Sequence, residues 1–135
     1  MQSSAELVCV DPARVQEVWP RARLLIKAAV DHTGLADFDY IERDVLAGSQ
    51  LLWLAIGDEI EAAATTRLAK ANGQLACELT ACSGSQMERW LPRFERIEQF
   101  ARDEGCKCVR IIGRGGWQRV LKNYRVEHVI LERLL

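Results

Sequence analysis

Apolar residues in the first third of the chain recur every three or four positions, which is the spacing of a helix with one buried face. After a short β-like run at Glu6–Val10, Asp11 and Pro12 supply an N-cap and the residue best tolerated at the first helical position. The pattern predicts a helix that reaches Gly34 and that Pro20 kinks or splits. The apolar positions of this helix are Val15, Val18, Trp19, Ala22, Leu25, Ile26 and Ala29.

A second, shorter helix is expected from about Asp39 to Ala47. Asp37 or Asp39 can cap its start, and Gly48 follows its end. Both predicted helices therefore precede any long β-like segment.

The pattern then changes to three β-like runs between positions 50 and 81. Gly57-Asp58 separates the first two runs, and Asn72-Gly73 separates the second from the third. An Asn-Gly pair between apolar runs is the strongest short hairpin signal. This part of the chain predicts an antiparallel meander.

The stretch from Leu79 to Cys106 runs from a β-like segment through a small polar turn into an amphipathic helix. Pro92 should kink this helix or leave it regular only after Trp90, and Gly105 ends it. One apolar stripe is formed by Met87, Trp90, Leu91, Phe94, Ile97, Phe100 and Ala101.

The remaining chain predicts a strand at Cys106–Gly113, a short helix from about Trp117 to Asn123 and a last strand at Val126–Leu134. A strand, a crossover helix and another strand of this length form a right-handed parallel βαβ unit. The predicted order is βααβββαβαβ, an α/β (α+β) fold in one domain over residues 1–135.

Composition narrows the function classes. The 135 residues, 49% apolar and 27% charged, indicate one soluble domain, and the net charge of -1 gives no electrostatic reason to expect nucleic acid or an anionic membrane as a partner. No long apolar segment or targeting pattern is present, so we expect a cytoplasmic protein. The five cysteines are expected to be reduced, and no metal site is expected because Cys106, Cys108 and His128 lack a fourth ligand.

The predicted order, together with "ELTACSGSQ" and "IEQFARDEGCKCVRIIGRGGWQRVLKNY", resembles the GNAT superfamily of N-acetyltransferases. The segment "GRGGWQRVLKNYRVEHVILERLL" is similar to short GNAT-like proteins encoded in bacteriophage and prophage gene clusters. The resemblance implies a mixed, mostly antiparallel sheet flanked by helices, without a counterpart of the family's last strand. It also implies an acyl-CoA-dependent N-acyltransferase.

In that family, acetyl-CoA lies where the fourth strand splays from the fifth, with its pyrophosphate on a Gln/Arg-x-x-Gly-x-Gly/Ala turn before a helix. The corresponding turn is Ala81–Met87, a partial match in which Ser85 or Gln86 replaces the second glycine. The resemblance implies that acetyl-CoA or CoA contacts Leu79, Thr80, Cys82, Gly84, Ser85, Gln86 and Arg114.

Two features of the same turn favour a different role. Ser85 and Glu88 form a capping box, which would satisfy the N–H groups that a pyrophosphate needs, and Glu88 would repel the anion. Arg89 is either a compensating cation or an ordinary solvated arginine. The turn is therefore either a degenerate pyrophosphate loop or a capped bend.

The resemblance also implies catalytic groups, namely a base for the acceptor amine and frequently a tyrosine that protonates the leaving thiolate. Glu78, on the strand before the turn, is the candidate base, or else a solvated strand glutamate. Tyr124 is the candidate acid, although Leu121 takes the family's tyrosine position and Tyr124 then packs. His128 is an alternative proton carrier, or else a strand histidine with a structural partner. Cys82 is an alternative nucleophile, or else a buried or spectator cysteine.

Three functions therefore remain open. The first is an N-acyltransferase that acts on a small-molecule or protein amine. The second is a non-catalytic GNAT-like phage or prophage protein acting in particle assembly or protein interaction, and the third is a binder of another nucleotide or acyl thioester. The uncovered sheet edge predicts a second copy of the chain or a phage protein as partner.

Overall fold

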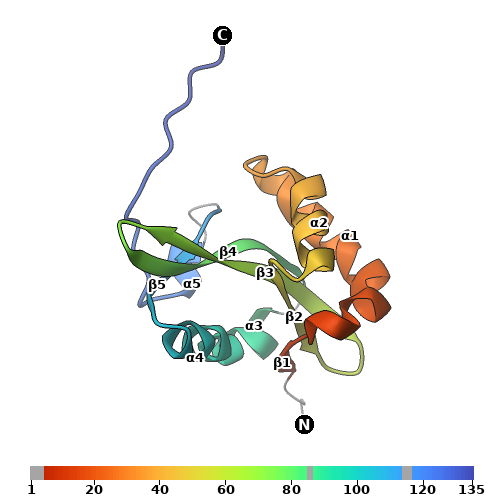
Figure 1. Ribbon diagram of the computed structural model, residues 1–135. Helices are drawn as coiled ribbons and strands as arrows, with labels where there is room; N and C mark the ends of the chain where they lie inside the picture. Colours follow the sequence, from red (N-terminus) through yellow and green to blue (C-terminus); the bar gives the residue numbers. More distant parts are fainter. Residues whose placement is uncertain (1–4, 85–86, 114–116) are drawn as a thin grey trace.

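A five-stranded sheet forms the middle layer of the computed structural model, with helices packed on both faces (Figure 1). The structure describes residues 5–84, 87–113 and 117–135, without the side chains of Met87, Glu88 and Gln118. The strands are β1 (Glu6–Cys9), β2 (Leu51–Ile56), β3 (Ile60–Ala71), β4 (Gln74–Gly84) and β5 (Cys106–Ile111).

The strands lie side by side in the order β1-β2-β3-β4-β5. The first four pair antiparallel, and β5 pairs parallel to β4. Asn72 and Gly73 join β3 to β4 with positive φ angles of 52° and 76°, as a tight hairpin turn requires. The predicted meander and the mixed, mostly antiparallel sheet are therefore confirmed.

Two N-terminal helices cover one face of the sheet. The 3₁₀ turn η1 (Pro12–Arg14) is capped by the Asp11 side chain and leads into α1 (Val15–Thr33), which Pro20 does not split. The second helix, α2 (Phe38–Ala47), starts after its N-cap Asp37.

The other face is covered by a helical segment that changes geometry at its proline. It consists of α3 (Met87–Trp90), the 3₁₀ turn η2 (Leu91–Phe94) and α4 (Glu95–Asp103). Pro92 lies at the start of η2, where the lost N–H and the ring clash interrupt α-helical hydrogen bonding. The helix is therefore interrupted after Trp90, as Pro92 predicted, but α-helical geometry resumes only at Glu95.

Alternating residues of the sheet feed two apolar cores. Leu52 and Leu54 of β2 pack against α1 and α2, whereas Trp53 and Ala55 pack against Trp90, Phe94 and Ile97 of the opposite layer. The central strands are therefore buried on both faces, which explains why their sequences are almost continuously apolar.

The predicted last strand at Val126–Leu134 is not formed. After α5 (Trp117–Val120), residues 125–135 have neither helix nor strand, and the chain leads away from the sheet (Figure 1). A strand forms only as part of a paired sheet, and in the described part of the chain this tail has no neighbouring strand. Its exposed apolar residues are Val126, Val129, Ile130, Leu131, Leu134 and Leu135.

Candidate functional site

The strands β4 and β5 part from one another halfway along β4. Their pairing ends at Leu79 and Ile111, with a last contact from the Ile112 N–H to the Leu79 carbonyl at 3.4 Å. Beyond that point β4 continues to Gly84 and pairs only with β3 in the described part of the chain. A cavity of about 550 Å³ lies where the strands part.

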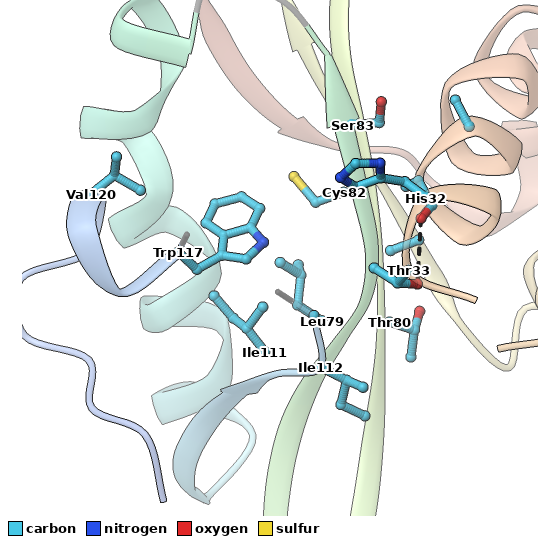
Figure 2. A pocket seen from close by; sticks show the side chains of 14 residues that line it. His32, Thr33, Leu79, Thr80, Cys82, Ser83, Ile111, Ile112, Trp117 and Val120 are labelled. Atoms are coloured by element: carbon cyan, nitrogen blue, oxygen red, sulfur yellow. Dashed lines mark hydrogen bonds between the residues drawn. The ribbon is translucent and has the colours of Figure 1, made fainter. Parts of the chain in front are cut away.

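Three parts of the chain line this cavity. Residues 79–83 of β4 provide its floor, and the last turns of α1 provide one wall through Ala28, Ala29, His32 and Thr33. The segment after β5 and the helix α5 provide the other wall. Figure 2 shows His32 and Thr33 approaching β4 from one side, and Ile111 and Trp117 from the other.

The floor contains a β-bulge at Thr80. Thr65 of β3 pairs with Ala81 and Thr66 pairs with Leu79, so Thr80 is an extra residue on β4 without a partner in that register. A bulge removes the backbone groups of the extra residue from the regular hydrogen-bond ladder. These groups lie at the cavity, just past the last rung between β4 and β5.

A chain of side-chain hydrogen bonds holds the bulge. The Thr80 and Thr65 hydroxyl oxygens are 2.6 Å apart, and the Thr80 hydroxyl donates to the Gln50 carbonyl oxygen at 2.7 Å. The Gln50 amide in turn donates to Asp44 on α2 at 3.2 Å. Gln50 is only 3% exposed, so its polar atoms need these partners.

The cavity wall is mostly apolar, and Cys82 is a buried thiol within it. Burial raises the pKa of Cys82 to about 12, so almost no thiolate forms at neutral pH. A nucleophilic cysteine needs a lowered pKa and a neighbouring base or positive charge. The structure therefore supports the packing role for Cys82 rather than the nucleophile.

Glu78, the predicted base, lies on one rung of the sheet between two arginines. Its carboxylate accepts hydrogen bonds from Arg67 of β3 at 2.8 Å and from Arg110 of β5 at 3.1 Å. Glu78 is 7% exposed and is not among the residues that line the cavity. Both carboxylate oxygens accept hydrogen bonds from arginines, so Glu78 forms cross-strand ion pairs. It is therefore not a solvated glutamate.

Tyr124, the predicted acid, does not line the cavity and packs against η2 and α4. Its hydroxyl donates to Glu98 at 2.7 Å, and its ring packs edge-on against Phe94. Burial and the Glu98 carboxylate raise the pKa of Tyr124. The structure thus favours the packing alternative, in which Tyr124 attaches the start of the tail to α4.

The predicted cofactor contacts divide into three groups. Leu79, Thr80 and Cys82 line the cavity together, as expected from the splayed strands. Gly84 ends β4 against Ala62, where an added Cβ would collide with the β3 backbone and side chain. Ser85, Gln86 and Arg114 lie outside the described residues, as does the side chain of Glu88, so the capping box remains a prediction.

Arg89 is neither solvated nor directed to the cavity. Its guanidinium lies 3.2 Å from the Glu61 carboxylate, and the two side chains are 16% and 7% exposed. Trp90 is buried among the core residues of the α4 face and does not line the cavity. Arg89 and Trp90, the described side chains of α3, therefore do not close the cavity.

The wall from α1 was missed by reasoning from sequence. Ala28, Ala29 and His32 lie on one side of a helix, at spacings of three and four residues, next to the glycine that ends it. Small side chains followed by a histidine on a helix flank are a weak signal, because alanine is also the commonest helix former. Only the packing of α1 on β4 gives the pattern a meaning.

The described residues contain neither a candidate metal-binding cluster nor a candidate membrane-spanning helix. No group of three or more histidine, cysteine, aspartate or glutamate side chains in them is placed to hold a metal ion. In the same part of the chain, none of the helices combines the length and apolarity needed to cross a bilayer.

Similarity in fold, but not in sequence, connects the chain to known proteins. No protein-family model matches it, and no curated protein matches it. An aminoglycoside acetyltransferase from an uncultured soil sample, solved with sisomicin, superposes with a TM-score of 0.67 at 9% identity, over 97% of this chain and 96% of that one.

Two further structures show the same relation. A predicted acetyltransferase from Clostridium acetobutylicum, solved with acetyl-CoA, has a TM-score of 0.65 at 11% identity, over 97% of this chain and 95% of that one. A ribosomal-protein-alanine N-acetyltransferase from Brucella melitensis has a TM-score of 0.64 at 8% identity, over 98% of both chains. The chain therefore has the fold of the GNAT acetyltransferases.

Proposed function

We propose that the protein is an acyl-CoA-dependent N-acyltransferase. The observation that carries the proposal is the cavity at the parting of β4 and β5, with the Thr80 bulge in its floor. A fold alone does not determine an activity, so the argument rests on this site.

The cavity fits the acyl-pantetheine arm of such a thioester. This arm is narrow and carries amides, and the gap offers both apolar walls and a strand edge that lacks its β5 partner beyond Leu79. A volume of about 550 Å³ lies within the usual range of small-ligand pockets. The fold-related C. acetobutylicum protein, solved with acetyl-CoA, supports this choice of ligand.

Leu79, Thr80 and Cys82 are proposed to contact the arm, because they share the floor of the cavity. Ile111 and Trp117 would cover its apolar part and exclude water from the thioester. A bound acyl-CoA supplies an activated acyl carbon. The diphosphate contacts of Ser85, Gln86 and Arg114 remain predictions.

The acceptor is proposed to be an amine, on a small molecule or on a protein. Two fold-related proteins support this class, since one is an aminoglycoside acetyltransferase and the other a ribosomal-protein-alanine N-acetyltransferase. Whether the acceptor is small or macromolecular is decided by the acceptor panel described below.

Calorimetric titration with acetyl-CoA tests the proposal. Ala28 is exposed on α1 and lines the cavity, so Ala28→Trp fills the cavity without entering the core. Leu24→Trp is the matched control, since Leu24 is 68% exposed one turn earlier and does not line the cavity. Gly84 is unsuitable because any side chain there strikes Ala62.

We expect micromolar binding, about 8 kcal/mol, to the wild type and to Leu24→Trp, and no binding to Ala28→Trp. Absence of heat at millimolar acetyl-CoA from folded wild-type protein would reject the proposal. Binding without acyl transfer to any amine would favour the simple thioester binder. The non-catalytic phage protein has no observation in its favour among the described residues and stays a prediction.

A second copy of the chain is the partner we propose. The same chain supplies an edge strand, β5, and an extended tail whose Leu131 and Leu134 are more than 90% exposed. The edge of β5 and the tail each lack a strand to pair with. If two copies of the chain exchanged tails, each tail could pair with the β5 edge of the other copy. The mass of the full chain in solution, compared with that of a chain without the tail, tests this partner.

A further inference from the structure

One cavity-lining side chain is of the type that exchanges protons near neutral pH. It is His32, in the last turn of α1. The other described lining residues are apolar or carry hydroxyls, apart from Cys82, whose thiol stays protonated at neutral pH. Acyl transfer to an amine requires that a proton leave the attacking nitrogen, so the cavity needs such a group.

Two of the hydroxyls that line the cavity already have partners. The Thr80 hydroxyl donates to Gln50, and the Thr33 hydroxyl lies 3.4 Å from the Val30 carbonyl of its own helix. Glu78 lies between Arg67 and Arg110. None of these three groups is placed to receive the proton.

The fold brings the histidine to this position from a distance of about fifty residues along the chain. Gly34 adopts a left-handed conformation with φ of 67° and ends α1 at Thr33, so the last helical turn stays beside β4. Figure 2 shows the imidazole on the α1 side of β4 and Trp117 on the other side, and Cys82 and Ser83 line the same cavity. A donor thioester and an acceptor amine in the gap would meet beside the imidazole.

We propose that His32 is a catalytic base for the acceptor, an inference that rests on the proposed function. Its neutral imidazole accepts the proton of the neutral amine as the nitrogen lone pair bonds to the thioester carbonyl carbon. The carbon–sulfur bond breaks, and the resulting imidazolium returns the proton to the leaving sulfur. One amide and one free thiol result, and His32 ends neutral.

The described charged and titratable groups that share the cavity or the end of α1 with His32 are few. On α1, Asp31 pairs with Lys27 at 3.2 Å. On β4 the facing titratable group is Cys82, and the described cavity-lining residues after β5 and on α5 add none.

The test uses the two histidines of the chain as a matched pair. His32→Gln removes the imidazole from the cavity, and His128→Gln removes the other imidazole from the exposed tail. Two readouts are combined: imidazole resonances by NMR during titration with CoA, and thiol release from acetyl-CoA with spermidine, sisomicin or an alanine-initiated peptide between pH 5.5 and 9.

We expect CoA to shift the His32 resonances and leave those of His128 in place. Thiol release by the wild type and by His128→Gln should fall towards the acid end of this pH range, since an imidazolium cannot accept a proton. His32→Gln should lose this acid limb and about 100-fold or more in rate, the usual contribution of a general base.

The failure of this inference is distinguishable from that of the proposed function. Absence of CoA binding rejects the function itself. CoA binding without thiol release with any of the three acceptors favours the thioester binder and removes the role of His32 with it. If thiol is released, unshifted His32 resonances or equal pH profiles in the wild type and His32→Gln would each overturn the role of His32 alone.

Discussion

At the scale of single residues, the site depends on a few buried polar contacts. Thr80 is held through Thr65 and Gln50 to Asp44, which ties the bulge in the cavity floor to a helix of another layer. None of these contacts has a local sequence pattern, because their members lie 6 to 30 residues apart. The run "LTAC" predicted a strand but not the bulge within it.

The Thr80 hydroxyl should matter for stability. Thr80→Val keeps the shape but leaves the buried Gln50 carbonyl oxygen without its donor, and we expect a loss of about 1–3 kcal/mol in urea unfolding. Thr80→Ser retains the hydroxyl and is the control, with a smaller loss. Equal losses in the two variants would show that the methyl packing, and not the hydrogen bond, holds the bulge.

The reactivity of Cys82 tests its burial. Because its pKa is raised to about 12, the thiolate fraction increases about tenfold for each pH unit below that value. Alkylation by iodoacetamide, followed for the Cys82 peptide by mass spectrometry, should therefore keep rising from pH 7 to pH 10. A plateau near pH 8 would identify an activated thiol and return Cys82 to the list of nucleophiles.

At the scale of elements, the sequence predicts best where one pattern acts alone. Helical spacing, the caps at Asp11 and Asp37 and the Asn72-Gly73 turn were each sufficient to place an element. Pro92 correctly predicted the break after Trp90. The predicted strand at Val126–Leu134 failed because a strand exists only with a partner, and an apolar β-branched run does not supply one.

One carboxylate adds polar contacts to the apolar packing of α1 on α2. Glu42 of α2 accepts hydrogen bonds from Arg23 at 3.0 Å and from Trp19 at 2.7 Å, both on α1. The hydrogen bond from Arg23 has the larger effect, and together with the bond from Trp19 it lowers the pKa of Glu42. A lowered folded-state pKa gives stability that is present above the unfolded-state pKa and disappears as the pH falls through the folded-state value.

Glu42→Gln should therefore reduce the free energy of unfolding by about 1 kcal/mol at pH 7, a value kept small because the pair is partly exposed. The difference from the wild type should shrink below about pH 4 and disappear once Glu42 is protonated. Urea unfolding from pH 7 to pH 2.5 measures this. A difference independent of pH would mean that the glutamine packs badly and the charge is irrelevant.

At the scale of the whole molecule, the site is assembled from segments that have no relation in sequence. α1, β4 and α5 meet around the cavity, although His32 and Trp117 are separated by most of the chain. The order of elements predicted the parting of β4 and β5 through the family resemblance. It did not predict the residues of α1, since which side of a helix faces a gap depends on tertiary packing.

The exposed tail makes a prediction about assembly. Light scattering coupled to size exclusion should give the mass of a dimer for the full chain and of a monomer for a variant that ends at Arg125. Tyr124, which packs on Phe94 and donates to Glu98, is retained in this variant, so the fold should persist. A monomeric full chain, or a dimer that survives the truncation, would exclude strand exchange.

The last rung between β4 and β5, at Leu79 and Ile111, determines where the cavity ends. This end of the cavity is set by main-chain pairing, which does not depend on side-chain identity. The side chains around it can therefore change while the position of the cavity stays the same. Identities of 8–11% at TM-scores of 0.64–0.67 are the natural outcome for such an architecture. A fold of this kind can persist through its strand pairing while most of its side chains differ.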